Sequence, residues 1–251
     1  MISLFLSGID DGSWLRAEGV IPEQIIACDS IGTLHARRSD IKANQTELRE
    51  KWRVCLKTNS DCLQGGIREA LQGADVCLAF SQPGPGIIPP TAVSAMNPRA
   101  IVFACANPIP EIWPDEALKA GAKIVATGRG DFPNQVDNSL AFPGVFRGTF
   151  DVQARAISEG MTRAGALALA HSARGRGLHE RSILPRTDDP EVAAQVAAAT
   201  GMQAVTEGLA MRPADHATLV KSALQRILAA RNATATLIRA GLIPSMPDRQ
   251  S

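Results

Sequence analysis

The sequence has 251 residues, of which 45% are hydrophobic, 20% charged and 4% aromatic, and its formal net charge is +1. A chain of this length and composition can bury a sizeable core, so we expect an ordinary globular protein. The balanced charge gives no reason to expect a nucleic acid or an anionic membrane as partner, and no apolar run could span a membrane, so small molecules and other subunits are the expected partners.

Residues 1–18 predict a degenerate or truncated start of a nucleotide-binding unit. Such a unit begins with a strand and then a glycine-rich turn, whose bare backbone lets a pyrophosphate approach a helix N-terminus. The stretch has no G-x-G-x-x-G pattern: Gly8 and Gly12 can form a tight turn, but Asp10 and Asp11 would face a phosphate with the wrong sign. We therefore expect abnormal phosphate binding at this turn.

A strand is predicted over residues 24–29, and it ends in an acid. Dinucleotide-binding folds place at such a strand end the carboxylate that hydrogen-bonds the adenosine ribose, so Asp29 and the adjacent Ser30 are cofactor-binding candidates. The alternative is an Asx turn with the residues that follow. Arg37 and Arg38 lie close enough in sequence to accept a 2′-phosphate, so the choice between NAD and NADP stays open.

The next part of the chain alternates between helix and strand. Residues 41–61 are polar and mixed in charge and predict a helical excursion; a short helix is expected over residues 65–71 and a strand over residues 75–80. The turn SQPGPG follows that strand directly. Because glycine and proline let the backbone approach a cofactor, Ser81 and Pro83 are further cofactor-binding candidates, although most such turns only reverse the chain.

Two short apolar runs, residues 101–106 and 123–127, are typical of strands in a buried parallel sheet. Asn107 follows the first run, and Gly128 follows the second. In an open α/β sheet, ligands bind at the edge formed by the carboxyl ends of the strands. We therefore expect the two turns to lie at a ligand-binding crevice.

A long loop is predicted from Gly128 to Gly148. Its apolar side chains are Phe132, Val136, Leu140, Phe142, Val145 and Phe146. With these anchors the loop should be packed, so that the amides of Asn134, Gln135 and Asn138 are held rigidly, and long ordered loops are usually functional. The alternative is that the asparagines only cap turns.

Residues 152–251 predict helices only. The second of three helical stretches begins at Asp189-Pro190-Glu191, and the third runs from about Asp215 to Ala240 and closes at Gly241. No linker separates these helices from the strands, so we expect a single domain over residues 1–251. The expected fold is α/β, a Rossmann-like parallel sheet with flanking helices and a C-terminal all-helical extension.

Cysteine and histidine give no sign of a metal or redox site. The cysteines are Cys28, Cys55, Cys62, Cys77 and Cys105. They form no C-x-x-C pattern, and the favoured interpretation is small buried hydrophobes in a reducing cytoplasm. The four histidines are scattered without the spacing of metal ligands. A cytoplasmic location is therefore expected.

The segments ANPIPEIWP, ATGRGDFPNQVDNSLAFPGVFRG and DVQARAI resemble the NAD(P)-binding domain of prokaryotic-type malic enzymes, which oxidise and decarboxylate (S)-malate to pyruvate and CO₂. The resemblance continues through CDSIGTL, KTN and GGIREALQGADVCLAFSQPGPG upstream, and through ILP and EGLAMRP downstream. It covers nearly the whole chain from about Gly19.

This resemblance implies site residues. Asn107 of the ANP turn would contact the nicotinamide and the substrate, and Asn138 of NQVDN would contact the substrate, so we expect the two turns to converge at one sheet edge. The chain departs from the family at Asp137, where NQVNN is usual, and at Gly130, where GRSDFP is usual. A carboxylate beside a dicarboxylate substrate weakens binding unless it points away.

The catalytic parts that the family uses lie upstream of the resembling region. Malate oxidation needs a base, a hydride acceptor, a divalent metal (Mg or Mn) and an acid. In the family, the base is a Lys, the hydride acceptor is NAD or NADP, and the acid is a Tyr. The metal is held by a Glu-Asp pair with a further Asp. This chain has no tyrosine and no Glu-Asp pair. We therefore expect the C-terminal NAD(P)-binding portion of a malic enzyme, without catalytic residues or metal ligands of its own and inactive alone.

Alternatives of another class remain open. The chain could be a truncated enzyme, a homo-oligomer, or a partner for a separate N-terminal catalytic half. It could instead be a non-catalytic nucleotide-binding or assembly module, or a decayed gene product. Nucleotide binding separates the last of these from the others, because a ligand that binds only the folded state raises its stability.

Overall fold

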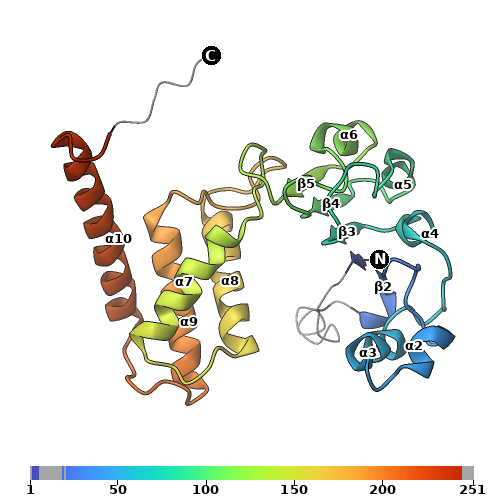
Figure 1. The fold of residues 1–251 in the computed structure, drawn as a ribbon, viewed down its shortest axis with the longest axis horizontal. Coiled ribbons are helices and arrows are strands. Elements are labelled where there is room, and N and C mark those ends of the chain that lie inside the picture. The colour runs from blue at the N-terminus through green and yellow to red at the C-terminus, as the bar shows by residue number, and fades with distance from the viewer. Residues whose placement is uncertain (1, 6–18, 20, 245–251) are drawn as a thin grey trace. The chain divides into compact units, whose positions relative to one another are not determined.

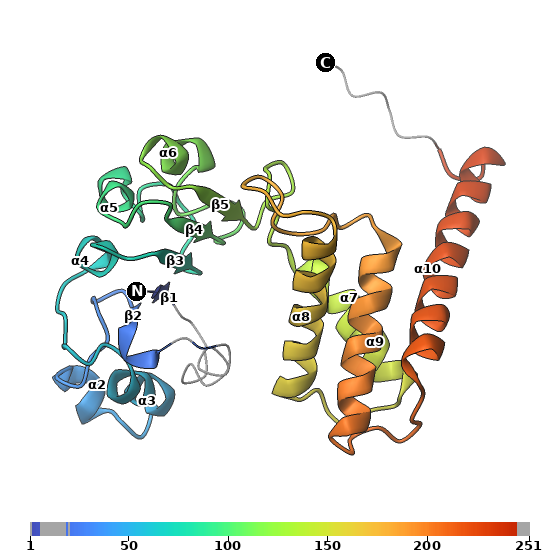
Figure 2. The ribbon, with the colours of Figure 1, turned by 180° about the vertical axis from the view of Figure 1, so that it is seen from behind.

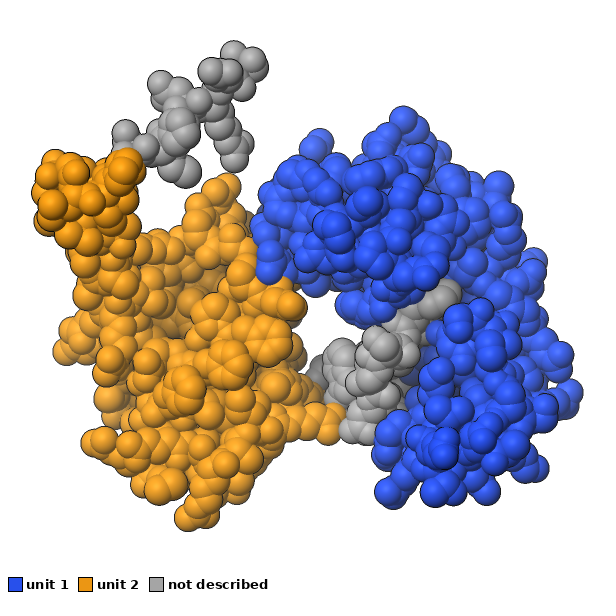
Figure 3. All heavy atoms as spheres, in the orientation of Figure 1, with its two compact units in different colours: residues 1–137, 178–183 blue, residues 138–177, 184–251 orange. Residues whose placement is uncertain are grey.

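The structure is a computed structural model that describes residues 2–5, 19 and 21–244 (Figure 1). The chain divides into two compact units (Figure 3). Unit 1 comprises residues 1–137 and 178–183, and unit 2 comprises residues 138–177 and 184–251. The predicted glycine turn with Asp10 and Asp11 lies outside the described residues. The single domain expected over residues 1–251 stays a prediction.

Unit 1 is built on a five-stranded parallel sheet in the order β2-β1-β3-β4-β5. Its strands are β1 (Ile2–Phe5), β2 (Ile25–Cys28), β3 (Val76–Ala79), β4 (Ile101–Ala104) and β5 (Ile124–Thr127). The register pairs Ala79 with Ala104 and Ala104 with Thr127, so the carboxyl ends of these three strands form one edge. The strand order reverses at β1, which is where open α/β sheets form a ligand crevice. The four strand predictions are confirmed, each shortened at one or both ends.

Helices cover both faces of the sheet. In unit 1 they are η1 (Pro22–Gln24), α2 (Ser39–Ala43), α3 (Arg49–Lys57), α4 (Ile67–Leu71), α5 (Pro90–Ser94) and α6 (Pro114–Lys119). Successive residues of β2 point to opposite faces. Ala27 packs with Ile41 and Val54 of α2 and α3, whereas Ile26 and Cys28 pack with α4. The main core lies between β3–β5 and helices α4–α6.

The described part of unit 2 contains four helices. They are α7 (Asn138–Asp151), α8 (Glu159–Gly175), α9 (Pro190–Thr206) and α10 (His216–Arg239) (Figure 2). Helix α9 packs against each of the other three, which explains why its apolar and small residues run all round it. The predicted start at Asp189 is confirmed: its side chain caps α9 by accepting from the amide of Glu191. Asp215 caps α10 in the same way, and Gly241 follows its end with a φ of +71°.

The predicted loop from Gly128 to Gly148 is wrong in its second half, because α7 begins at Asn138 and contains Pro143. The many proline and glycine residues indicated a loop, but two of the glycines allow α7 to pack closely on α9. A Cβ at Gly144 would lie 2.6 Å from Cβ of Val196, and one at Gly148 would lie 2.2 Å from the carbonyl oxygen of Ala197. The backbones of α7 and α9 therefore touch, and this packing outweighs the poor helix propensity of glycine.

The predicted fold class is confirmed: an α/β, Rossmann-like parallel sheet with flanking helices, followed by an all-helical part. Among the described helices, none combines the length and the apolar character that crossing a membrane requires.

Candidate functional site

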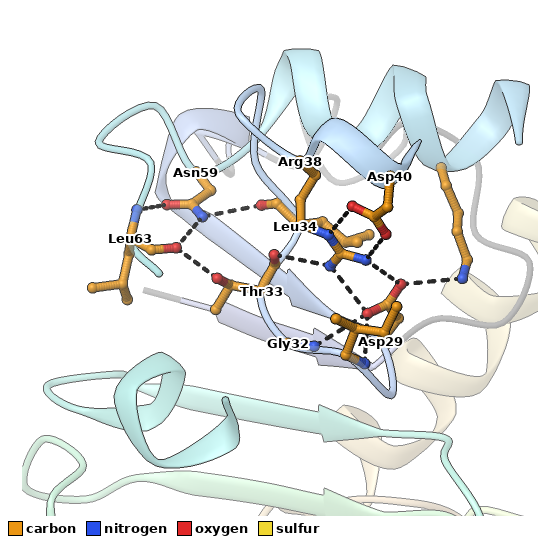
Figure 4. Close-up of polar contacts among 10 residues, drawn as sticks. Asp29, Gly32, Thr33, Leu34, Arg38, Asp40, Asn59 and Leu63 are labelled. Atoms are coloured by element: carbon orange, nitrogen blue, oxygen red, sulfur yellow. Dashed lines mark hydrogen bonds and ion pairs between the residues drawn. The ribbon is translucent and has the colours of Figure 1, made fainter. Parts of the chain in front are cut away.

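Asp29 stands directly after β2, at the carboxyl edge of the sheet, and its carboxylate receives five hydrogen bonds (Figure 4). Its Oδ1 accepts from the amides of Ile31 (3.0 Å) and Gly32 (3.2 Å), so the Asx turn considered above is present. The guanidinium of Arg38 donates to both carboxylate oxygens, at 3.1 and 3.3 Å, and Lys51 Nζ donates to Oδ2 at 3.2 Å. The candidate carboxylate is thus held in place by its own turn and by two cations.

Arg38 uses all of its donors within this network. Its Nε and Nη2 donate to Asp40 at 2.7 and 2.6 Å, its Nη1 and Nη2 donate to Asp29, and Nη1 also donates to the carbonyl of Thr33 at 3.3 Å. Arginine has five N–H groups, and these contacts account for all five. In this arrangement Arg38 has no donor left for a 2′-phosphate, whereas the side chain of Arg37 is exposed.

The charges of this network shift the pKa values of its members. Burial favours the neutral form of Asp29, but the hydrogen bonds from Arg38, Ile31 and Lys51 outweigh it and lower the pKa. The hydrogen bond from Arg38 lowers the pKa of Asp40 to about 2. The same bond raises the pKa of Arg38. All three groups are therefore charged at neutral pH.

The asparagine of the KTN segment has a structural role beside this network. Asn59 is buried with a φ of +50°. Its Nδ2 donates to the carbonyls of Leu34 and Leu63, each at 3.0 Å, and its Oδ1 accepts from the amide of Leu63 at 2.8 Å. Thr33 Oγ1 also donates to the Leu63 carbonyl. These bonds fix the loop that carries Arg38 over Asp29 (Figure 4).

His35 gives this region a pH dependence that can be measured. Its Nδ1 accepts from the amide of Arg37 at 3.2 Å, so the imidazole is neutral there. Burial, then the charges of Arg38 and Arg37, lower its pKa below the ordinary value of 6.5. The unfolded chain therefore takes up a proton at a higher pH than the folded chain does.

We expect the free energy of unfolding to fall as the pH is lowered from about 7.5 to about 5, because the unfolded state gains the His35 proton first. Urea titrations across this range, followed by tryptophan fluorescence, measure the slope. His35→Gln removes the titration, so its stability should fall less steeply over the same range. Equal slopes in the two proteins would contradict this assignment.

At the other strands, the buried carboxylate of Glu111 joins two loops of the carboxyl edge. Glu111 is completely buried. Its Oε1 accepts from the amide and the hydroxyl of Ser81, at 2.8 and 3.1 Å, and its Oε2 accepts from the amide of Ala106 at 3.0 Å. The loop after β3 is thereby tied to the loop after β4. This places two predicted candidates, Ser81 and Asn107, in neighbouring loops.

The turn after β3 lies along the β4 loop over its whole length. The amide of Gly84 donates to the carbonyl of Ile109 at 3.3 Å, and that of Gly86 donates to the carbonyl of Glu111 at 3.1 Å. Pro83 is exposed at its tip. The predicted Gly/Pro turn is therefore hydrogen-bonded through its backbone to the β4 loop. It borders the carboxyl edge of the sheet and does more than reverse the chain.

Arg129 connects the loop after β5 to the loop after β4. Its Nη1 donates to the carbonyl of Pro108 at 2.9 Å, and the Asn107–Pro108 peptide bond is cis. Nε and Nη2 of Arg129 donate to Asp131 at 2.8 and 2.7 Å. Its guanidinium also lies over the rings of Trp113 and Phe132. Asn107 itself is exposed, on a turn that Glu111 and Arg129 hold from both sides.

The asparagines of the β5 loop have different roles. Asn134 is buried and donates to the carbonyls of Val125 (3.0 Å) and Glu180 (2.8 Å), while accepting from the amide of Ile183 (2.9 Å), so it is held rigidly but ties backbone segments together. Asn138 is the exposed first residue of α7. Asn107 belongs to unit 1 and Asn138 to unit 2, and their convergence stays a prediction.

Sequence reasoning missed Glu111 and the joining role of Arg129. The signal for Glu111 was present: one acid stands between Pro110 and Ile112 in the apolar stretch IPEIWP. A lone charge in such surroundings is either exposed or fully hydrogen-bonded. The roles of Arg38 and Lys51 at Asp29 carried no comparable signal.

The described residues offer little for nucleophilic or metal chemistry. Cys105 follows β4, but burial, and secondarily the charge of Glu111, raises its pKa to about 12, so the thiol is protonated. In the part of the chain that the structure describes, no three histidine, cysteine, aspartate or glutamate side chains are grouped to hold a metal ion.

A parallel, doubly wound sheet whose loops gather at the carboxyl edge defines the class of dinucleotide-binding α/β proteins. The sequence profile of one family, described as "Malic enzyme, NAD binding domain", matches residues 16–205. The chain belongs to this family.

Individual relatives agree with the family. The chain is 38% identical over 186 residues to the bifunctional malic/malolactic enzyme of Bacillus subtilis (strain 168), covering 74% of this chain and 44% of that protein. It is 35% identical over 240 residues to the NADP-dependent malic enzyme of Rhizobium meliloti (strain 1021), covering 90% of this chain and 30% of that protein. The chain thus spans less than half the length of these relatives.

A solved structure extends the likeness to the fold. The malic enzyme of Entamoeba histolytica superposes with a TM-score of 0.92 at 39% identity, covering 98% of this chain and 51% of that one.

Proposed function

We propose that this chain is the NAD(P)-binding part of a malic enzyme, which oxidises (S)-malate with NAD or NADP and releases pyruvate and CO₂. The observation that carries the proposal is the gathering of the loops after β3, β4 and β5 by Glu111 and Arg129, beside the point where the strand order reverses. Open α/β sheets bind their ligands at this place. Similar proteins are named as NAD- and NADP-dependent malic enzymes.

In the proposed site, Asp29 holds the adenosine ribose, but it must first lose a donor. A carboxylate offers about four acceptor positions, and Asp29 already accepts five hydrogen bonds. The side chain of Lys51 is 43% exposed, against 9% for Arg38, so Lys51 can leave at least cost. We therefore expect the ribose hydroxyls to replace Lys51 at Oδ2.

The other candidates line the remainder of the site. Ser30, Ser81 and Pro83 would contact the cofactor, and Asn107 would orient the nicotinamide, which accepts the hydride. Asn138 would bind the carboxylate end of malate. Gln135 donates to the carboxylate of Asp137 at 3.2 Å. The aspartate that departs from the family pattern is therefore hydrogen-bonded within its own loop. Among the described residues, no three histidine, cysteine, aspartate or glutamate side chains are grouped to hold a divalent metal.

The preference between NAD and NADP depends on cations other than Arg38. A 2′-phosphate would need charged donors near Asp29, and the donors of Arg38 are used. Arg37 is exposed, and 43% of the Lys51 side chain is exposed. A displaced Lys51 next to a 2′-phosphate would favour NADP.

The first test is nucleotide binding by calorimetry and by thermal unfolding. NAD or NADP at a hundred times its Kd should raise the free energy of unfolding by about 2.7 kcal/mol. Asp29→Asn should weaken binding at least about tenfold, because a charge-assisted bond to the ribose is lost. Lys51→Met should bind NAD at least as tightly as the unmodified chain, since it has no donor to displace.

Three outcomes would count against the proposal or part of it. Binding of neither nucleotide by the unmodified chain would refute it. Unchanged affinity in Asp29→Asn would leave Asp29 as a purely structural residue. Stabilisation by nucleotide without any further effect of malate, which Asn138 is proposed to bind, would favour the alternative of a non-catalytic nucleotide-binding or assembly module. We expect no malate-dependent NAD(P)H formation by the chain alone.

The proposal extends to assembly and location. We propose that both units belong to one NAD(P)-binding domain, and that the working enzyme is a homo-oligomer or includes a separate catalytic half. A cytoplasmic location is supported by the five cysteines, all of which are free.

A further inference from the structure

A cavity of about 360 Å³ lies beside β5, within unit 1. It is bordered by α6, the first half of β5, the loop after β5 and the segment 178–183. Small-molecule sites are concave, have volumes of about 300–1,000 Å³ and carry a few polar groups on mostly apolar walls. The cavity therefore has the size of a small-molecule site, and it shares no predicted residue with the proposed nucleotide site.

The walls of the cavity are largely apolar. Val125 of β5 is buried, and Phe132 of the following loop is half-buried. Leu118 of α6 lines the cavity while remaining 49% exposed, and Pro114 and Pro133 add to the apolar lining. An occupant with an apolar body would cover the leucine and the ring, which stabilises binding in proportion to the apolar area buried.

Phe132 is one of the apolar side chains that the sequence predicted to pack the loop after β5. Leu140 and Val145, predicted alongside it, are buried. Phe142 and Phe146, however, are 51% and 44% exposed on α7, so the prediction is wrong for these two rings. Phe132 is half-buried and borders the cavity, so it serves both its loop and this site.

The polar side chains of the cavity are engaged with partners, except for one. Asn134 donates both of its amide hydrogens to backbone carbonyls, and its oxygen accepts from a backbone amide. Lys123 Nζ pairs with Glu180 at 2.6 Å, and Lys119 Nζ pairs with Asp115 at 3.1 Å. The charges of these residues therefore cancel in pairs.

Arg181 is the exception. Its side chain is exposed, and among the described residues its guanidinium has no hydrogen-bond or ion-pair partner. Asn134 fixes the segment that carries it, through bonds to the carbonyl of Glu180 and the amide of Ile183. A guanidinium binds a carboxylate through two parallel hydrogen bonds. One unmatched positive charge suits a carboxylate better than a phosphate group, which carries a charge of about −1.5 to −2.

Phe132 also connects the cavity to the turn of Asn107. Its ring centroid lies 6.1 Å from that of Trp113, and the guanidinium carbon of Arg129 lies 5.7 Å from the centroid of Phe132. Arg129 Nη1 in turn donates to the carbonyl of Pro108 at 2.9 Å. An occupant of the cavity would therefore contact the ring that supports Arg129, and Arg129 holds the turn.

We propose that this cavity binds an aromatic carboxylate, and that the bound ligand stiffens the Asn107 turn through Phe132 and Arg129. Arg181 binds the carboxylate group, and Leu118 and Phe132 contact the aromatic body. Resting on the proposed function, in which Asn107 orients the nicotinamide, the ligand strengthens nucleotide binding, because part of the ordering of the turn is already complete.

The first test is calorimetric titration of the full chain with 2-naphthoate, in the absence of nucleotide. We expect a Kd of about 1 mM or lower, which is the affinity of a compact ligand of this size. Arg181→Met should weaken binding at least about tenfold, because a charge-assisted pair of hydrogen bonds is lost. The uncharged 2-naphthamide should bind the unmodified chain at least about tenfold more weakly for the same reason. Arg174→Met is the matched control with unchanged affinity, since Arg174 is exposed in the last turn of α8 and does not line the cavity.

The second test is hydrogen exchange of residues 105–112 with and without 2-naphthoate, again in the absence of nucleotide. Exchange of this stretch should slow at least about threefold in the unmodified chain and stay unchanged in Arg181→Met. NAD binding is then measured with 2-naphthoate at about ten times its Kd, and it should become at least about fivefold tighter.

Failure of the 2-naphthoate to bind, or equal binding by Arg181→Met, would overturn the proposal. Binding without slower exchange of residues 105–112 would refute the connection through Phe132. NAD affinity that 2-naphthoate leaves unchanged or lowers, in a chain that binds NAD, would refute the regulation of nucleotide binding. A chain that binds 2-naphthoate with slower exchange, yet binds neither nucleotide, would support the cavity as a site while refuting the proposed function.

Discussion

Replacing Glu111 by alanine is expected to lower the free energy of unfolding by about 3 kcal/mol, since hydrogen bonds to a charged group contribute about 1.5–3 kcal/mol each and their buried donors are left unpaired. The carboxylate accepts from the amides of Ser81 and Ala106 and from the Ser81 hydroxyl. Losing it removes the side-chain connection between the β3 and β4 loops and leaves only their backbone hydrogen bonds. Nucleotide binding should weaken as well, because both loops line the proposed site.

Urea unfolding followed by tryptophan fluorescence measures this loss, and Trp113 stands two residues from the substitution. Glu111→Gln keeps one acceptor oxygen and should lose less. Glu116→Ala is the matched control, because Glu116 is exposed on α6. A loss in Glu111→Ala no larger than in Glu116→Ala would show that the buried carboxylate does not hold the edge together.

Gly148→Ala is expected to destabilise unit 2 by about 3 kcal/mol, the upper part of the range for overpacking a tight contact. The new Cβ would lie 2.2 Å from the carbonyl oxygen of Ala197 and 3.0 Å from the amide nitrogen of Gly201. Both are backbone atoms of α9, so relief requires moving a helix. The better helix propensity of alanine, about 1 kcal/mol, cannot offset this.

Gly175→Ala is the matched control, since no atom outside its own stretch of helix backbone lies within 4 Å of the Cβ position there. Its stability should be unchanged or slightly raised. Far-UV circular dichroism follows the helices, whereas the described tryptophans, Trp52 and Trp113, both lie in unit 1. If the two units form one domain, Gly148→Ala should shift both signals together. An unperturbed helical transition would contradict the close contact of α7 and α9.

The sequence located most elements because their patterns are local. Apolar runs bounded by turn residues predicted β2 to β5, and acids before apolar helical repeats predicted the starts of α9 and α10. The same local reasoning failed over residues 138–148, where proline and glycine indicated a loop. Their effect depends on α9, which lies far along the chain, so no local pattern could show it.

The candidate site was likewise only partly predictable from the sequence. That Asp29 follows a strand was readable from the sequence, but its saturation by Arg38 and Lys51 depends on loops that meet only in the fold. The importance of Glu111 follows from burial rather than from residue type. Ser81 and Asn107 were expected at one edge, and hydrogen bonds to Glu111 bring their loops together.

The sequence by itself therefore determined the order of the elements and the family, since periodicity, turn residues and motifs act over short stretches. The tertiary structure alone decided which donors Asp29 and Glu111 engage, why Gly144 and Gly148 sit within a helix, and which face of α7 carries exposed rings. These features arise from contacts between residues distant in the chain, whose energies depend on burial and on the distances that the fold creates.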